Sequence, residues 1–403
     1  MSLFYFQIIS FVLSLIGYVL MARQFGAAAF GSVFAALAIA SVLIDLLDFG
    51  RCAWICREIS ACRANLNHAI LLLRKVENRF LVLAVPTSII FVGIYKDLSV
   101  APIFIYPTAW LIVNYTQSYL IASKKFKDAG ILLFVEKVIS FAIVLFSIHQ
   151  GYSSLLALSF VVVLPVFAHA FISVLYGAKL LQADSKLGDS EDFLKLNPDK
   201  HLDFGVRSIT TDLLQLEIPI AKLLLDPISA GVFAMIIKFR NPMSIGFNFI
   251  VSLTSPLITS RDFRKLSEIY KKLLLIALLN LIAIIFFAVT LTTSISIKIF
   301  GNDFLLLKNA ALPMVLTFFF WSIFNVSTSW QVAMGEEKYV RKLTIYVIVL
   351  HLVVLFSLCK YTSLEIVSWS IFIEMMLVGL YVYRSVDSTI QSNLGIKLRT
   401  FKC

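Results

Sequence analysis

Apolar residues follow one another in long stretches along the whole chain, without the short periodic alternation of a soluble protein. A helix needs about 20 mostly apolar residues to cross a bilayer, and stretches of that length recur from end to end. This pattern predicts an all-α polytopic membrane protein with about twelve transmembrane helices. The predicted spans are residues 2–22, 30–49, 80–95, 102–122, 129–148, 155–181, 206–224, 228–254, 271–296, 304–333, 340–359 and 362–383.

The longest polar stretch divides these spans into two sets of six. An internal repeat supports the division, because ARQFGAAAFGSVFAAL (22–37) aligns without gaps on KLLLDPISAGVFAMII (222–237) and places Gly31 on Gly231. Each segment is expected to form a tight outer turn into the second helix of its half. Two pseudo-symmetric lobes of this kind are typical of transporters. The predicted parts are an N-terminal six-helix lobe (1–181), a cytoplasmic linker (182–205), a C-terminal six-helix lobe (206–383) and a cytoplasmic tail (384–403).

Composition and charge agree with a membrane protein. Hydrophobic residues make up 60% of the 403 and charged residues 15%, against about 45–50% and about 25% in soluble domains. The net charge of +11 does not indicate nucleic-acid binding, because most basic residues fall in alternate loops, as the positive-inside rule requires. Both termini are therefore expected in the cytoplasm. The outside loops hold only Arg23, Lys96, Lys298, Lys308 and Lys360.

Motifs for enzymatic or metal chemistry are missing from the sequence. It contains no G-x-x-x-x-G-K-[ST], H-E-x-x-H or G-x-S-x-G pattern. Cys52, Cys56 and Cys62, with His68 nearby, have no recognised zinc-ligand spacing. We therefore expect neither an enzyme nor a bound metal or cofactor, and any transport energy has to come from a gradient.

The segment ARQFGAAAFGSVFAALAIASVLIDLLDFG (22–50) resembles the opening of bacterial O-antigen and capsule flippases. There the first outer turn has the pattern R-x-L-G-P-x-x-F-G, and the second helix closes on D-x-G. These flippases belong to the multidrug/oligosaccharidyl-lipid/polysaccharide exporter (MOP) superfamily. The chain departs from their pattern at Phe25, where leucine is commoner, and at Ala27, where proline is commoner. The helix count, the two halves and the turn GEEKYVRK (335–342) are also similar to that family.

The resemblance implies a translocase in the bacterial inner membrane. Its implied substrate is an undecaprenyl-diphosphate-linked oligosaccharide repeat unit, flipped to the periplasmic leaflet for O-antigen and surface-polysaccharide synthesis. The implied fold is two six-helix lobes around a V-shaped cleft that opens alternately to each side and holds the diphosphate with cationic side chains. Besides membrane lipids, a polysaccharide polymerase and a chain-length regulator would be partners.

Cationic side chains inside predicted spans are the first candidates for substrate binding. A charge at mid-bilayer costs about 2.5–3.5 kcal/mol on insertion scales, so each one needs a partner or a watery cavity. Arg207, Gln215 and Lys222 fall on one side of the seventh helix, and we predict that this stripe meets phosphate. The alternative is that Arg207 and Lys222 extend to opposite membrane surfaces.

The eighth helix carries a second polar face with Lys238, Asn241 and Asn248, and Arg240 lies beside it. Guanidinium groups suit phosphate oxygens, and amides suit sugar hydroxyls. These residues, together with Arg23, complete the predicted cationic cleft. In the alternative interpretation, Lys238 and Arg240 are internal ion-pair partners of acidic residues in other spans.

Acidic residues and a histidine inside predicted spans are candidates for ion coupling, since buried carboxylates and imidazoles can exchange protons. A satisfied structural hydrogen bond is their alternative role. Glu136 and Lys137, adjacent in the fifth helix, point about 100° apart, so each is expected to need a different partner. Asp48 is expected to pair with Arg51. The coupling candidates are Asp45, Asp212, Glu217, Glu374 and His351.

Aromatic and amide side chains that could contact sugars lie on two further helices. Trp321 and Asn325 share a face of the tenth helix, and Asn114 lies among aromatic residues of the fourth. Aromatic faces with amides suit sugars, but Trp and Tyr also gather at membrane interfaces, so this assignment has a structural alternative.

Two other functions compete with the flippase. A cation-coupled drug or metabolite exporter of the same fold would favour carboxylates over cations in the cleft, and the sequence offers both. A membrane polysaccharide polymerase is disfavoured, because the outside loops here are short, whereas that enzyme usually presents a large periplasmic loop.

Overall fold

The computed structural model describes residues 2–48, 52, 98–122, 125–184, 216–239, 294–333 and 336–394, with short pieces between 281 and 292. Every regular element in these ranges is helical. Seven helices of the described ranges are long and apolar enough to cross a membrane, which confirms the predicted all-α polytopic fold class. These seven are Val12–Asp48, Leu98–Ile121, Phe126–His149, Leu155–Tyr176, Leu307–Gln331, Tyr339–Cys359 and Leu364–Ser385.

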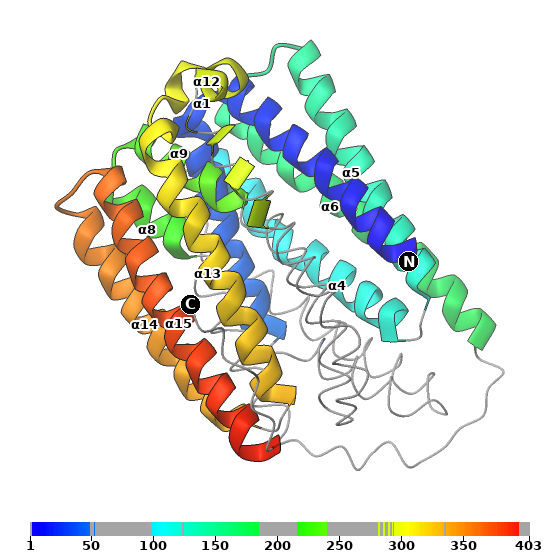
Figure 1. The fold of residues 1–403 in the computed structure, drawn as a ribbon. Helices are drawn as coiled ribbons and strands as arrows, with labels where there is room; N and C mark the ends of the chain where they lie inside the picture. Colours follow the sequence, from blue (N-terminus) through cyan, green and yellow to red (C-terminus); the bar gives the residue numbers. More distant parts are fainter. Residues whose placement is uncertain are drawn as a thin grey trace. The chain divides into compact units, whose positions relative to one another are not determined.

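The chain separates into two compact units, Met1–Leu223 and Leu224–Cys403. The predicted linker (182–205) lies outside the described residues except for its first three, which continue a helix. The first unit contains α1 (Ser2–Asp48), the 3-10 helix η1 (Leu98–Ile105), α4 (Tyr106–Ala122), α5 (Phe126–His149), α6 (Leu155–Asp184) and α8 (Glu217–Leu224). The second contains α9 (Pro227–Lys238), α12 (Ser294–Phe300), η4 (Asn302–Phe304), α13 (Leu307–Ala333), α14 (Glu337–Cys359) and α15 (Leu364–Leu394) (Figure 1).

Helix α1 is broken into two arms at Gly26. Its 47 residues would extend about 70 Å as one straight helix, more than twice the bilayer core of about 30 Å. Gly26 has φ 78° and ψ 167°, a conformation that essentially only glycine adopts. The rings of Tyr18 and Phe34 lie 5.6 Å apart edge to face, whereas sixteen residues of straight helix would separate them by about 24 Å. The two arms therefore fold against each other as the first two predicted spans.

The internal repeat has a structural counterpart at this break. In the alignment of 22–37 on 222–237, Gly26 corresponds to Asp226, which lies two residues after the end of α8 and caps α9 with an extended backbone (φ −64°, ψ 157°). Both segments thus contain the predicted turn. Gly31 and Gly231 themselves lie buried inside helices, so the turn comes five residues before the aligned glycines.

Close helix contacts hold each unit together. In the first unit α1 packs chiefly on α5, where Phe6 lies so near Gly130 that an added methyl group would be 2.8 Å from its ring. In the second unit α13 packs chiefly on α15, where Gly379 approaches the backbone of Phe320. Small residues at such positions let helix backbones come together.

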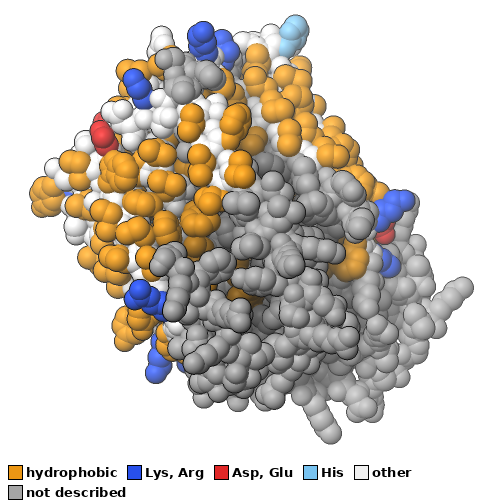
Figure 2. All heavy atoms as spheres, in the orientation of Figure 1, with side chains coloured by type: hydrophobic (Ala, Val, Ile, Leu, Met, Phe, Trp, Pro, Cys, Tyr) orange, Lys and Arg blue, Asp and Glu red, His pale blue; other side chains and the backbone are white. Residues whose placement is uncertain are grey.

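The outward faces of the described helices are apolar. Figure 2 shows hydrophobic side chains covering much of their visible surface, with Lys and Arg near helix ends. On α14, for example, Val353 and Phe356 are each 56% exposed. Exposed apolar side chains of this extent suit contact with lipid, as predicted for a polytopic membrane protein.

Candidate functional site

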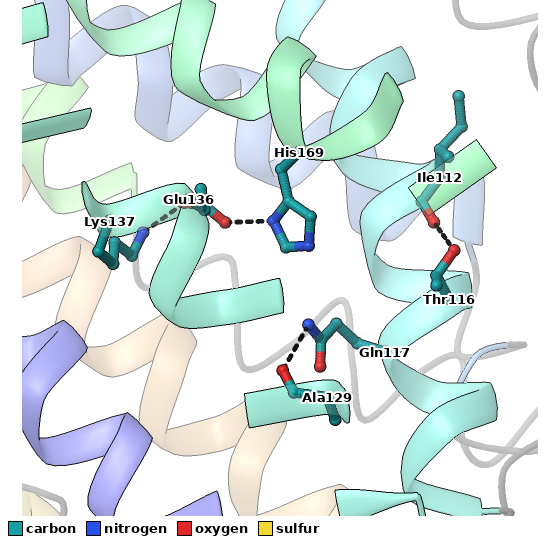
Figure 3. A network of polar contacts seen from close by, with 7 residues as sticks. All are labelled: Ile112, Thr116, Gln117, Ala129, Glu136, Lys137 and His169. Atoms are coloured by element: carbon teal, nitrogen blue, oxygen red, sulfur yellow. Dashed lines mark hydrogen bonds and ion pairs between the residues drawn. The ribbon is translucent and has the colours of Figure 1, made fainter. Parts of the chain in front are cut away.

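A carboxylate and an imidazole meet inside the first unit, between α5 and α6. Glu136 Oε2 lies 2.6 Å from His169 Nδ1, and the two side chains are only 2% and 1% exposed (Figure 3). Each comes from an otherwise apolar stretch, LLFVEKVIS for Glu136 and PVFAHAFIS for His169. The hydrogen bond offsets part of the cost of burying two polar groups at this depth.

Lys137 binds the other oxygen of the same carboxylate. Its Nζ lies 2.5 Å from Glu136 Oε1, and its side chain is 26% exposed. The prediction that these adjacent residues need different partners was wrong. Although their Cα–Cβ bonds diverge around α5, the long lysine side chain bends back far enough to reach its neighbour, which leaves Glu136 with two basic partners (Figure 3).

A second buried pair joins α14 and α15 in the second unit. His351 Nδ1 lies 3.0 Å from Glu374 Oε2, with the side chains 2% and 7% exposed. Both residues were predicted as separate coupling candidates, and the structure brings them together. The other carboxylate oxygen, Glu374 Oε1, is buried with no hydrogen-bond partner among the described residues.

Sequence reasoning did not select His169, although one signal was available. Five histidines occur in the chain, and those inside the predicted spans are His169 and His351. Each of the two contacts a glutamate on a neighbouring helix. A histidine inside an otherwise apolar span therefore indicated a buried contact with a carboxylate, and His169 could have been selected on that ground.

The predicted cationic cleft is only partly described. Arg23 is exposed near the break in α1. Lys222 is half-buried in α8, in the first unit, and Lys238 is half-buried at the end of α9, in the second unit. Arg207 and Arg240 lie outside the described residues. The grouping of these cations around one substrate stays a prediction.

Two of the remaining acidic candidates lie on helices of the first unit. Asp45 is half-buried in the second arm of α1, Glu217 is buried as the first residue of α8, and Asp212 lies outside the described ranges. Asp48 is also buried. Its carboxylate accepts hydrogen bonds from the Tyr115 hydroxyl at 3.1 Å and the Cys52 backbone N–H at 3.2 Å; its predicted partner Arg51 is not described.

Of the predicted sugar contacts, the structure describes three residues. Asn114 and Asn325 are half-buried on α4 and α13. Trp321 is 8% exposed, and its ring stacks on Phe324 with centroids 5.1 Å apart. Their role toward sugars stays a prediction. Gln215, Asn241 and Asn248 lie outside the described part of the chain.

The sequence matches no protein-family profile, and no curated protein is significantly similar to it. Several solved structures do match in fold. One is an inward-facing multidrug resistance MATE family transporter of the MOP superfamily, 13% identical over 95% of each chain with a TM-score of 0.61. Another is an outward-facing transporter of the same description, 16% identical over 97% of each chain with a TM-score of 0.60.

A third match is a MOP superfamily transporter from Pyrococcus furiosus, 14% identical over 97% of this chain and 94% of that one, with a TM-score of 0.61. It is described as having a binding pocket of reverse polarity that suggests a different function. At such identities the likeness concerns the fold alone. The protein thus has, over nearly its whole length, the polytopic all-α fold of MOP superfamily transporters.

Proposed function

We propose that this protein is a secondary transporter that exports cationic organic molecules in exchange for protons. The observation that carries the proposal is the sign of the buried charge. Among the Asp, Glu, Lys and Arg side chains whose burial the structure describes, the four that are buried are all carboxylates: Asp48, Glu136, Glu217 and Glu374. Lysines 137, 222 and 238 are only half-buried.

Buried carboxylates favour cations over diphosphates. Glu136 is neutralised by Lys137, so we attribute this preference to Glu374. An anionic diphosphate approaching an ionised Glu374 would meet like charge in a medium of low dielectric constant, whereas a cationic drug or metabolite would gain attraction. The multidrug transporters that share the fold are in line with this choice. The exporter, an alternative on sequence alone, therefore becomes our leading function.

The His351–Glu374 pair supplies a chemically suitable coupling site. Oε2 of Glu374 is held by the imidazole, and Oε1 is buried without a partner in the described part of the chain. A proton bound to this carboxylate removes its charge, and release of the proton restores it. A cationic substrate and a proton would then stabilise different charge states of the transporter, which is how exchange is coupled.

Proteoliposomes with an imposed pH gradient and ethidium as the probe test this function. The native protein is expected to move ethidium against its gradient only while the proton gradient lasts. Glu374→Gln removes the exchangeable charge but keeps the shape of the side chain, so gradient-driven transport is expected to fall to background.

Glu365→Gln is the matched control, because Glu365 lies on the same helix but is exposed. It is expected to transport ethidium like the native protein. Equal transport by Glu374→Gln and the native chain would contradict coupling at this pair. Native protein that moves no ethidium under any pH gradient would contradict the exporter.

Flipping of undecaprenyl-diphosphate-linked oligosaccharides is the second candidate function. Its specific support is the 22–50 segment and the half-buried Lys222 and Lys238. On this hypothesis, bacteria lacking the protein accumulate lipid-linked repeat units in the cytoplasmic leaflet. The native chain restores surface polysaccharide, but Lys222→Ala, Lys238→Ala and Arg240→Ala variants that insert normally do not. Unchanged polysaccharide in the deletion strain would rule this function out.

A further inference from the structure

The buried cluster of Glu136, Lys137 and His169 contains one more basic group than its charge balance needs. Lys137 already neutralises the carboxylate through Oε1. His169 contacts Oε2, but its positive charge is not required to compensate Glu136. The imidazole can therefore be neutral, leaving the cluster without net charge, or protonated, giving it a charge of plus one.

The hydrogen bond defines which nitrogen is available for a proton. In the neutral form His169 donates Nδ1–H to Glu136 Oε2, since a carboxylate can only accept. The lone pair is then on Nε2. This nitrogen is buried and has no hydrogen-bond partner within the described ranges, in a side chain that is 1% exposed. A buried imidazole whose second nitrogen makes no hydrogen bond is unusual for a purely structural histidine.

The residues around the cluster favour a histidine that gains and loses a proton over a permanently charged one. Tyr18 of α1 and Tyr106 at the start of α4 interact electrostatically with Glu136. Phenols keep their protons at neutral pH, so these two residues add polarity without adding charge. His169 is the group of this cluster that can bind a further proton, because its Nε2 has no hydrogen-bond partner within the described ranges while Nδ1 contacts Glu136.

The second unit repeats the arrangement on its own last two described helices. There the imidazole is on α14 and the carboxylate on α15, whereas in the first unit the carboxylate is on α5 and the imidazole on α6. A buried imidazole–carboxylate contact thus occurs within each unit, and in each case it is made through Nδ1 of the histidine.

We propose that His169, held by Glu136, is a second proton-binding site, so that each unit of the transporter takes up its own proton. This inference rests on the proposed proton-coupled function. A proton from water binds Nε2 of His169 and raises the charge of the cluster from zero to plus one, while Nδ1–H stays donated to Glu136. Release of the proton restores the neutral cluster.

Nitrogen NMR of histidine-labelled protein in lipid nanodiscs tests the site without any transport measurement. The imidazole signal that is lost in His169→Gln is expected to move between its neutral and cationic positions as the pH is lowered from about 8 to 5. His169→Asn serves as a second variant for the assignment. His149→Gln, at the exposed end of α5, is the matched control and should leave that signal in place. A His169 signal that stays in one form over this range overturns the proposal.

Ethidium transport then separates this proposal from the function on which it rests. If His169 titrates, the number of protons taken up per ethidium exported is expected to fall in His169→Gln. This variant should still export ethidium, but it should reach a smaller ethidium concentration gradient than the native protein. An unchanged proton count in that variant overturns the second site but leaves the exporter intact. A titrating His169 in a protein that moves no ethidium overturns the exporter instead.

Discussion

At the scale of single residues, Asp226 shows how one carboxylate fixes the start of a helix. It is the N-cap of α9 and accepts hydrogen bonds from the backbone N–H groups of Ile228 and Ser229, both at 3.0 Å. The hydrogen bonds from Ser229, by its side chain first and then its backbone, lower the pKa of Asp226 below its ordinary value. Pro227 follows at a position where the missing N–H costs no helical bond.

Replacement of Asp226 by Ala is expected to destabilise the protein by about 1 kcal/mol at neutral pH, because two backbone donors lose their acceptor. Since the folded carboxylate holds its proton less tightly than the unfolded one, this contribution is complete above the ordinary carboxyl pKa of about 4 and is lost as the pH falls from there through the lowered pKa of the folded Asp226. Thermal unfolding midpoints of both proteins in detergent, measured from neutral pH to below the ordinary carboxyl range, check this. Asp226→Asn keeps a hydrogen-bond acceptor, so its loss of thermal stability should be smaller and independent of pH. Equal midpoints for Asp226→Ala and the native protein at pH 7 would contradict the capping role of Asp226.

The cluster around Glu136 marks the limit of prediction at this scale. The sequence shows that a carboxylate inside a span needs a partner, and it placed Glu136 and Lys137 on α5 correctly. The sequence does not show which apolar faces of neighbouring helices pack against each other. His169, 33 residues after Glu136, could therefore not be identified as its partner. His351 and Glu374 were found as separate candidates, and their contact required the packing of α14 on α15.

At the scale of helices, several boundaries follow from the sequence to within a few residues, although α15 (Leu364–Leu394) extends eleven residues beyond the predicted span 362–383. The predicted span 129–148 is α5, Phe126–His149, and 340–359 is α14, Glu337–Cys359. The predicted span 102–122 deviates more, because it begins as the 3-10 helix η1 from Leu98 and becomes α-helical only at Tyr106. Pro102 lies inside η1, and a proline cannot donate the hydrogen bond that an α-helix interior requires.

The break in α1 is expected to depend on glycine at position 26. Gly26→Ala places a Cβ in a backbone conformation that costs of order 1–3 kcal/mol for other residues, so the thermal midpoint of the purified protein should fall. Gly17→Ala is the matched control, since Gly17 lies in the same helix with open space around it and should tolerate a methyl group. A Gly26→Ala protein as stable as the Gly17→Ala protein would show that the two arms do not need this turn.

At the scale of the whole molecule, hydrogen bonds between distant segments report the direction of the spans in the first unit. Gln24 Nε2, beside the break in α1, donates to the carbonyl of Tyr152 after α5 at 3.0 Å, so these two turns lie at the same end. At the other end of α5, Asp128 accepts a hydrogen bond from the Tyr176 hydroxyl at 2.7 Å. The hydrogen bonds place the turns at Gly26 and Tyr152 at one end of the unit and Asp128 at the other. That the turns at Gly26 and Tyr152 face outward stays a prediction.

A membrane-impermeant maleimide applied to intact bacterial cells tests that orientation. In protein whose native cysteines are replaced by serine, Ser153→Cys should be labelled directly, whereas Lys127→Cys should be labelled only after the membrane is opened. Both positions are exposed and flank α5, whose 24 residues extend about 36 Å and so cross the bilayer core. Labelling of Lys127→Cys alone in intact cells would invert the topology.

The transporter fold could be predicted from the sequence. It depends on the number of spans, on the polar stretch that divides them into two sets and on the internal repeat, and all three can be read along the chain without knowing which helices pack together. The substrate class that we propose was not accessible from the sequence, because the proposal depends on which charges are buried. Along the sequence, Lys238 looked as deeply placed as the acidic residues, whereas Lys222 lies near the end of its predicted span. In three dimensions, Glu217 and Glu374 are buried, and those two lysines are only half-buried.

Two helices joined through a single residue cannot enter a bilayer one after the other. Because Gly26 closes the arms of α1 directly on each other, the first 48 residues have to be inserted during synthesis as one hairpin. In the predicted orientation, in which this turn faces outward, Arg23, three residues before the bend, has to cross the hydrocarbon with the tip, at a cost of about 2.5–3.5 kcal/mol on insertion scales. The two apolar arms enter lipid together with Arg23, and the burial of their apolar side chains offsets that cost.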